Sequence, residues 1–131
     1  MTKKITDYSI EIHASVGSGL IAQILFENEN IFVGRIDFYR DVTPPVSYLW
    51  HPTSTTDENQ IYLVLAMPAD LFPVITELIR TEKPWSLELW PSGPLIGAST
   101  DGYGGTLNTS KDQLIGEEVV EARQLLRAVR S

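Results

Sequence analysis

The sequence lacks several residue types on which enzymes and small secreted proteins commonly depend. It contains no cysteine, which excludes disulfide bridges and thiolate chemistry. It has only two histidines, His13 and His51, so few side chains suit general base catalysis or zinc binding near neutral pH. The composition therefore predicts no metal and no cofactor, and it favours a protein that is not an enzyme.

Long apolar segments are also missing from the chain. No apolar run approaches the length that crosses a membrane. The stretch from Met1 to Asp7 is not followed by the apolar core of a signal peptide. We therefore expect a soluble protein of the cytoplasm that does not act at a membrane.

Basic residues are few and scattered. The chain has 10 lysines and arginines against 17 aspartates and glutamates, a formal charge of -7, and no Lys/Arg cluster. Because binding to a phosphate backbone requires clustered cations, a nucleic-acid partner is not expected. The acidity is typical of a soluble surface, and it also suits a basic protein partner.

The most informative stretch of the sequence begins at residue 60. Residues 60–67 form an apolar run in which both alternating sets are apolar, which predicts a strand covered on both faces of a sheet. The apolar spacing then changes to that of a helix near 70–82, with Asp70 as its N-cap and Pro73 in its first turn. The predicted core-facing helix residues are Leu71, Val74, Ile75, Leu78 and Ile79.

A further strand is predicted at 85–90, after the helix stops before Pro84. In this strand Trp85, Leu87 and Leu89 share the predicted core face, and Trp90 lies on the opposite face. The core prediction combines the two strands and the helix: Leu63, Leu65, Leu71, Ile75, Leu78 and Leu87.

The N-terminal part reads as three strands near 5–14, 20–27 and 31–40. Their short connections predict an antiparallel three-stranded meander, with Asn28 or Asn30 in the left-handed region of a hairpin turn. Gly34, in the middle of a strand, indicates a bulge or a closely packed neighbour.

The later connections are predicted to be less regular. The long connection 41–59 allows only a short edge strand at 46–50. A last short strand is expected at 95–99, and glycine makes 100–110 an expected irregular loop. The fold class that follows is α+β: one domain over residues 1–131, built on a mainly antiparallel sheet. A curved, half-open barrel around the central helix is the alternative.

The C-terminal segment predicts a helix near 116–130. Acidic residues stand near its start and arginines near its end, which complements the helix dipole. Its apolar residues recur at steps of four and three: Ile115, Val119, Ala122, Leu126 and Val129. This stripe either docks on the sheet of its own chain or pairs with the same helix of a second subunit to form a homodimer.

No catalytic residue is assigned from the sequence. Ser54 and Asp57 stand near His51, but a triad is defined by geometry rather than by proximity in sequence, and His51 is interpreted as a surface residue. Glu11 and His13 share a strand face, yet two ligands do not make a metal site. The segment 100–106 lacks the lysine of a phosphate-binding loop.

Aromatic residues near polar groups are the best candidates for recognition. Trp50, His51, Trp90 and Tyr103 are the predicted binding residues, because tryptophan and tyrosine are enriched in binding surfaces. The resulting hypothesis is a small, acidic, non-enzymatic protein-binding or adaptor module, of which an inhibitor or immunity-type protein is one concrete version. The alternative is a small-ligand binder or enzyme with a pocket between the loops 41–59 and 100–110.

Overall fold

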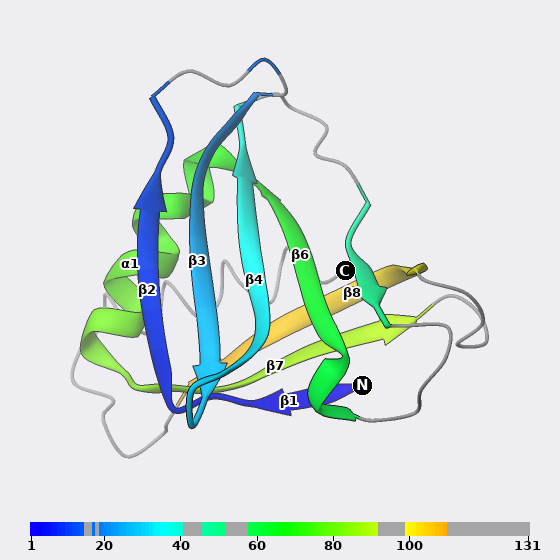
Figure 1. The fold of residues 1–131 in the computed structure, drawn as a ribbon. Coiled ribbons are helices and arrows are strands. Elements are labelled where there is room, and N and C mark those ends of the chain that lie inside the picture. Colours follow the sequence, from blue (N-terminus) through cyan, green and yellow to red (C-terminus); the bar gives the residue numbers. More distant parts are fainter. Residues whose placement is uncertain (15–16, 18, 41–45, 52–57, 92–98, 110–131) are drawn as a thin grey trace.

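A computed structural model of the chain describes residues 1–14, 17, 19–40, 46–51, 58–91 and 99–109 (Figure 1). Within these ranges the protein is mainly sheet with one α-helix, so the mixed α+β class is confirmed. The strands are β1 (Thr2–Lys4), β2 (Asp7–Ile12), β3 (Leu20–Asn28), β4 (Ile31–Tyr39), β5 (Tyr48–Trp50), β6 (Tyr62–Pro68), β7 (Pro84–Pro91) and β8 (Ser99–Thr109). The helix α1 (Phe72–Thr81) follows the 3-10 turn Ala69–Leu71, and a second such turn spans Glu58–Gln60.

The strands hydrogen-bond in the order β1-β7-β8-β5-β6-β4-β3-β2. The two end strands, β1 and β2, are consecutive in the chain and are joined by Ile5 and Thr6. The Ile5 N–H donates to the Trp85 carbonyl of β7, and the Thr6 N–H donates to the Glu27 carbonyl of β3, each at 2.8 Å. The chain therefore passes directly from one end of the sheet to the other, and the sheet is strongly curled. Figure 1 shows β7 and β8 crossing behind β3, β4 and β6, with β1 alongside β7.

The N-terminal meander is confirmed, since β2 pairs with β3 and β3 with β4, both antiparallel. The turn between β3 and β4 places both Glu29 (φ 49°) and Asn30 (φ 71°) in the left-handed region. Gly34 fulfils both expectations for its position. The β3–β4 register shifts beside it, and a Cβ there would lie 2.5 Å from the Leu63 carbonyl oxygen.

The central strand and helix also agree with the sequence. Strand β6 lies between β4 and β5, and Leu63, Val64 and Leu65 are all buried, so it is covered on both faces. Three residues of α1 are buried in the core: Ile75, Leu78 and Ile79. Leu71 is only half-buried at the edge of that core.

Two local predictions concern the start of α1. Pro73 lies in the first turn as expected. The Asp70 cap is wrong, because Leu71 occupies the N-cap position without a side-chain hydrogen bond and Asp70 belongs to the preceding 3-10 turn. The preceding 3-10 turn leads into the helix without a side-chain cap, because the Phe72 N–H donates to the Ala69 carbonyl.

Trp85 does not face the core, although Leu87 and Leu89 of the same strand are fully buried. The β7–β8 register shifts between Pro84 and Ser86, so the period-two alternation breaks at this tryptophan. Trp85 is 49% exposed, and its indole Nε1 donates to the Thr109 carbonyl at 3.1 Å. The prediction that Trp85 belongs to the core is therefore wrong.

The glycine-rich stretch after residue 99 is a strand rather than an irregular loop, since β8 continues to Thr109. The glycines allow close packing: a Cβ at Gly102 would lie 2.5 Å from Leu89 Cδ1, and one at Gly105 would lie 2.5 Å from Leu65 Cδ2. Likewise β5 is not an edge strand, because it lies between β6 and β8.

Two predicted elements lie wholly or mainly outside the described residues. They are the helix near 116–130 and the strand at 95–99, of which only Ser99 is described, as the first residue of β8. In the part of the chain that the structure describes, no helix combines the length and apolarity needed to cross a membrane.

Candidate functional site

The central strands have two distinct faces, because directly paired residues in neighbouring strands point to the same side of a sheet. Ile24, Ile36 and Leu65 form one row of partners across β3, β4 and β6, and all three are buried. This apolar side is the inner face. The next row, Leu25 and Arg35 with their partners in β6 and β5, belongs to the opposite side, the outer face.

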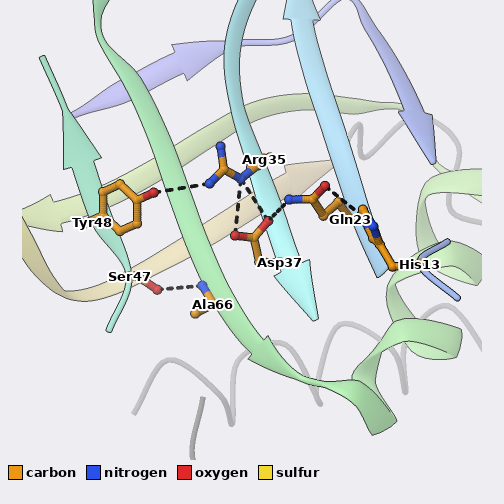
Figure 2. Close-up of polar contacts among 7 residues, drawn as sticks. All are labelled: His13, Gln23, Arg35, Asp37, Ser47, Tyr48 and Ala66. Carbon is orange, nitrogen blue, oxygen red and sulfur yellow. Dashed lines mark hydrogen bonds and ion pairs between the residues drawn. The ribbon is translucent and has the colours of Figure 1, made fainter. Parts of the chain in front are cut away.

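A hydrogen-bonded polar network runs across the outer face from β3 to β5 (Figure 2). Arg35 Nε donates to Asp37 Oδ1 at 2.9 Å and to Oδ2 at 3.2 Å, and Arg35 Nη2 donates to the Tyr48 hydroxyl at 3.2 Å. Gln23 Nε2 donates to Asp37 Oδ1 at 2.9 Å. Asp37 is only 3% exposed, so charge-assisted bonds replace the water that this carboxylate has lost.

His13 terminates the network at the end of β2. A carboxylate only accepts hydrogen bonds, so the amide nitrogen of Gln23 faces Asp37 and its Oε1 faces His13 Nε2 at 3.0 Å. His13 Nε2 therefore carries the proton and donates it. This hydrogen bond anchors the His13 ring to Gln23 at the edge of the sheet.

The electrostatics of the network favour a fixed ion pair. Burial disfavours the Arg35 cation, but attraction and hydrogen bonding to Asp37, together with Tyr48 and Tyr62, outweigh burial and raise the pKa of Arg35. Burial and the same carboxylate raise the pKa of Tyr39. Both shifts move away from neutral pH, the opposite of what a general acid or base requires.

Three aromatic side chains form an aromatic row beside this network: Phe32, Tyr62 and Trp50, from β4, β6 and β5. The Trp50 and Tyr62 rings stack with centroids 5.1 Å apart and planes 17° apart. The Phe32 and Tyr62 centroids are 5.2 Å apart at 57°. All three side chains are half-buried, so the row presents a rigid and partly exposed apolar surface.

Exposed carboxylates on the flanking strands β2, β3 and β8 define an acidic rim of the outer face: Asp7, Glu11, Glu27 and Asp101. Asp7 and Glu27 are direct cross-strand partners, and Glu27 is also the partner of Phe32. Asp101 is the partner of Tyr48 across β5 and β8. Like charges placed directly opposite each other destabilise a sheet, so the Asp7–Glu27 pair is a local cost to the fold.

Three of the four predicted binding residues lie on strands, Trp50 on β5, Trp90 on β7 and Tyr103 on β8, and His51 directly follows β5. Trp50 ends β5 and contributes to the aromatic row. His51 follows it and is only 7% exposed, so its interpretation as a surface histidine is wrong. Trp90 is half-buried in β7 opposite Gly104, and Tyr103 belongs to β8.

The residues that sequence reasoning missed are Arg35, Asp37, Tyr48 and Tyr62. For Arg35 and Asp37 the signal is present in the sequence, since both alternate with apolar residues along β4. The alternation reveals a polar face but not the partners that bury it, because Gln23 and Tyr48 come from other strands.

The other chemistry considered from the sequence gains no support. Among the described residues no three His, Asp or Glu side chains are grouped so that they could hold a metal ion. Ser54 and Asp57 lie outside the described ranges. By contrast, the two segments proposed as pocket walls are neighbours in the sheet, since Tyr48 of β5 is the partner of Asp101 of β8.

Comparison with known proteins identifies no relative of this chain. No protein-family model matches the chain, and no curated protein or solved structure is significantly similar to it. The function is therefore inferred from the outer face alone.

Proposed function

We propose that the protein is a small, acidic, non-enzymatic module that binds a basic protein through its outer face. The observation that carries this proposal is the aromatic row, held beside the Arg35–Tyr48 pair on the same outer face as the acidic rim. An inhibitor or immunity-type protein remains one concrete version, with the cytoplasm as the proposed location.

The composition and rigidity of the surface support binding. Tryptophan, tyrosine and arginine are the residue types most enriched at the energetic centres of protein interfaces. Trp50 is stacked on Tyr62, and the Tyr48 hydroxyl is held by Arg35. Because these side chains are already ordered, a partner would lose little additional conformational entropy when it binds them.

The charges of the rim favour a basic partner. Arg35 is already paired with Asp37, whereas the rim carboxylates are exposed. A lysine or arginine of the partner placed between Asp7 and Glu27 would relieve their repulsion. The relief of this repulsion would then contribute favourably to the free energy of binding. The formal charge of -7 would also steer a cationic partner and speed its association.

Affinity capture with matched variants tests this proposal. Wild type, Trp50→Ala and Glu27→Lys are immobilised, with Trp85→Ala as the control because Trp85 is an exposed tryptophan on another strand. Captured proteins are identified by mass spectrometry from native lysate at low salt, and binding is then measured with the purified candidate.

We expect a basic protein that binds wild type and Trp85→Ala equally. Trp50→Ala should weaken its binding by about 2 kcal/mol or more, the usual loss at an interface hot spot. Glu27→Lys should slow association and reduce its dependence on salt. Failure to retain any partner, or equal binding by all four proteins, would contradict the proposal.

A small-ligand binder or enzyme with a site between the segments 41–59 and 100–110 is the second candidate. The direct pairing of Tyr48 with Asp101 favours it, because the two segments are neighbours. Thermal stabilisation of the purified protein by a member of a metabolite library, lost in Trp50→Ala, would support this candidate. A library without effect would leave the protein-binding proposal ahead.

The helix near 116–130 also remains part of the proposal, on the grounds of its apolar stripe and its charge distribution. It would give the module either a second layer or a homodimer contact.

A further inference from the structure

Three apolar side chains of β2 form an exposed strip on the inner side of the sheet. Tyr8, Ile10 and Ile12 are 39%, 43% and 73% exposed. Their direct partners in β3 are core residues that are at most 1% exposed: Phe26, Ile24 and Ala22. The strip therefore extends the apolar inner face onto the last strand, where the described residues leave it open.

An exposed apolar strip of this kind is normally covered by another structural element. Single apolar residues on a surface are ordinary, but this one is continuous with the core and lies on the side that a sheet normally buries. The same face of β4 is covered, since the Phe38 and Phe72 rings meet edge-to-face at 5.0 Å. Strand β2 lacks an equivalent cover among the described residues.

Hydrogen bonds link the end of the described chain to the start of the strand that carries this strip. Thr109, the last residue of β8, donates from Oγ1 to the buried Glu82 carboxylate at 3.0 Å and accepts from Trp85 Nε1. The Trp85 carbonyl in turn accepts from Ile5 N, two residues before β2 begins. Thr109, where the described chain ends, is therefore linked through Trp85 and Ile5 to the start of β2.

The length and pattern of the C-terminal segment fit the strip. A helix over 116–130 would be about 22 Å long at 1.5 Å per residue. The six residues of β2 extend about 20 Å at 3.3 Å per residue. Residues 110–115 would connect Thr109 to the helix, and the stripe at 119, 122 and 126 would face one side.

We infer that residues 116–130 dock on the strip formed by Tyr8, Ile10 and Ile12 of the same chain. The position of Thr109 favours docking of the same chain's segment over docking of a second copy. A short tether gives the segment an effective concentration near the millimolar range. The half-exposed Trp85 beside Thr109 adds apolar surface to the contact. This contact does not depend on the outer face or on its proposed partner.

Engineered cysteine pairs test the contact directly, because the natural chain has no cysteine that could form a competing disulfide. Ile10→Cys is combined with Leu126→Cys and, one helical turn away, with Ala122→Cys. The control combines Ser9→Cys with Leu126→Cys, since Ser9 is the neighbour of Ile10 on the opposite face. Each protein is oxidised mildly at low concentration.

We expect an intramolecular disulfide in at least one Ile10→Cys pair and none in the Ser9→Cys control, because a disulfide needs Cα atoms within about 7 Å. Equal cross-linking of both faces, or none at all, would overturn the inference. Concentration-dependent dimers linked through the Ile10→Cys pairs would instead assign the strip to a second copy.

Hydrogen exchange provides a test without cross-links. Leu126→Glu should lower the protection of β2 amides about tenfold or more, while the remaining strands stay protected and the mass in solution stays monomeric. Gln124→Glu, on the opposite side of the predicted helix, should leave β2 unchanged. Unchanged β2 exchange in Leu126→Glu, or a wild-type dimer that this variant dissociates, would refute intramolecular docking.

Discussion

Strand β4 has buried residues on both of its faces, but different forces bury them. Ile36 and Phe38 on the inner face are fully withdrawn from water against other apolar side chains. Asp37, between them in sequence, is nearly as inaccessible, yet it lies in an ion pair with Arg35 and accepts a bond from Gln23. Burial alone therefore does not distinguish a core position from a site position in this strand.

The difference has consequences for substitution. The hydrophobic effect is not directional, so the inner face depends mainly on volume and close packing. The hydrogen bonds of the outer face are directional, and removing one partner leaves another buried group unsatisfied.

The largest effect is expected on the inner face. Leu78→Ala removes a fully buried side chain of α1 and should lower the free energy of unfolding by about 2–5 kcal/mol. Urea denaturation followed by circular dichroism measures this loss. A variant with the melting temperature of wild type would show that this face of α1 does not pack on the sheet.

On the outer face, Asp37→Ala removes the acceptor of Arg35 and Gln23 and should cost about 2–4 kcal/mol. The double variant Asp37→Leu with Arg35→Met should cost much less, because both charges are replaced together. A double-mutant cycle from denaturation curves measures the coupling. If the double variant loses as much as the two single variants combined, pairing is not what holds the outer face.

His51→Ala should cost about 1–3 kcal/mol, because it empties a buried position. A surface histidine in a polar loop would cost under about 0.5 kcal/mol, so the measurement discriminates between the two interpretations. Thermal denaturation of the variant and wild type at the same pH is sufficient.

The turn between β3 and β4 maintains the register that separates the two faces, since a slip of one residue would exchange them. Glu29 adopts a left-handed conformation that suits asparagine better. Glu29→Asn should therefore raise the free energy of unfolding by about 0.5–1 kcal/mol. A loss of stability in denaturation curves would mean that the Glu29 side chain has a structural role.

Tyr39 should make the stability of the folded protein decrease at alkaline pH. Burial and Asp37 raise its pKa above the ordinary value of 10.0, so the folded state holds this proton more tightly than the unfolded chain does. Its contribution is fully present below about pH 10 and is lost as the pH rises through the folded pKa. Tyr39→Phe should lose stability less steeply than wild type in melting curves recorded between about pH 9 and 12. Identical slopes would contradict the shift.

Much of the local structure could be predicted from the sequence. The change of apolar spacing after residue 67 identified β6 and α1, and the short polar turns identified the meander. Gly34 indicated a close approach that the structure confirms at Leu63. These features depend on neighbours within one turn or one strand, so the local pattern contains them.

Other features could not be predicted because they depend on distant partners. The glycines of β8 resemble a loop until Leu65 and Leu89 are placed against them. The alternation in β7 is correct except at Trp85, where a register shift with β8 intervenes. The candidate site was predicted only in part: Trp50 was found, whereas the polar network of Arg35 was visible only as an alternation.

The sequence by itself determined which segments are strands and helix around residues 60–90, because side-chain periodicity is a property of the local chain. The tertiary structure decided the parallel pairing of β4 with β6, the position of β5 beside β8 and the passage of the chain through Ile5 and Thr6. It also made the outer face a site, by bringing Trp50, Tyr62 and Arg35 from three strands to one surface. Backbone hydrogen bonds are alike for every sequence, so only the packing of distant side chains selects which strands pair and what they present together.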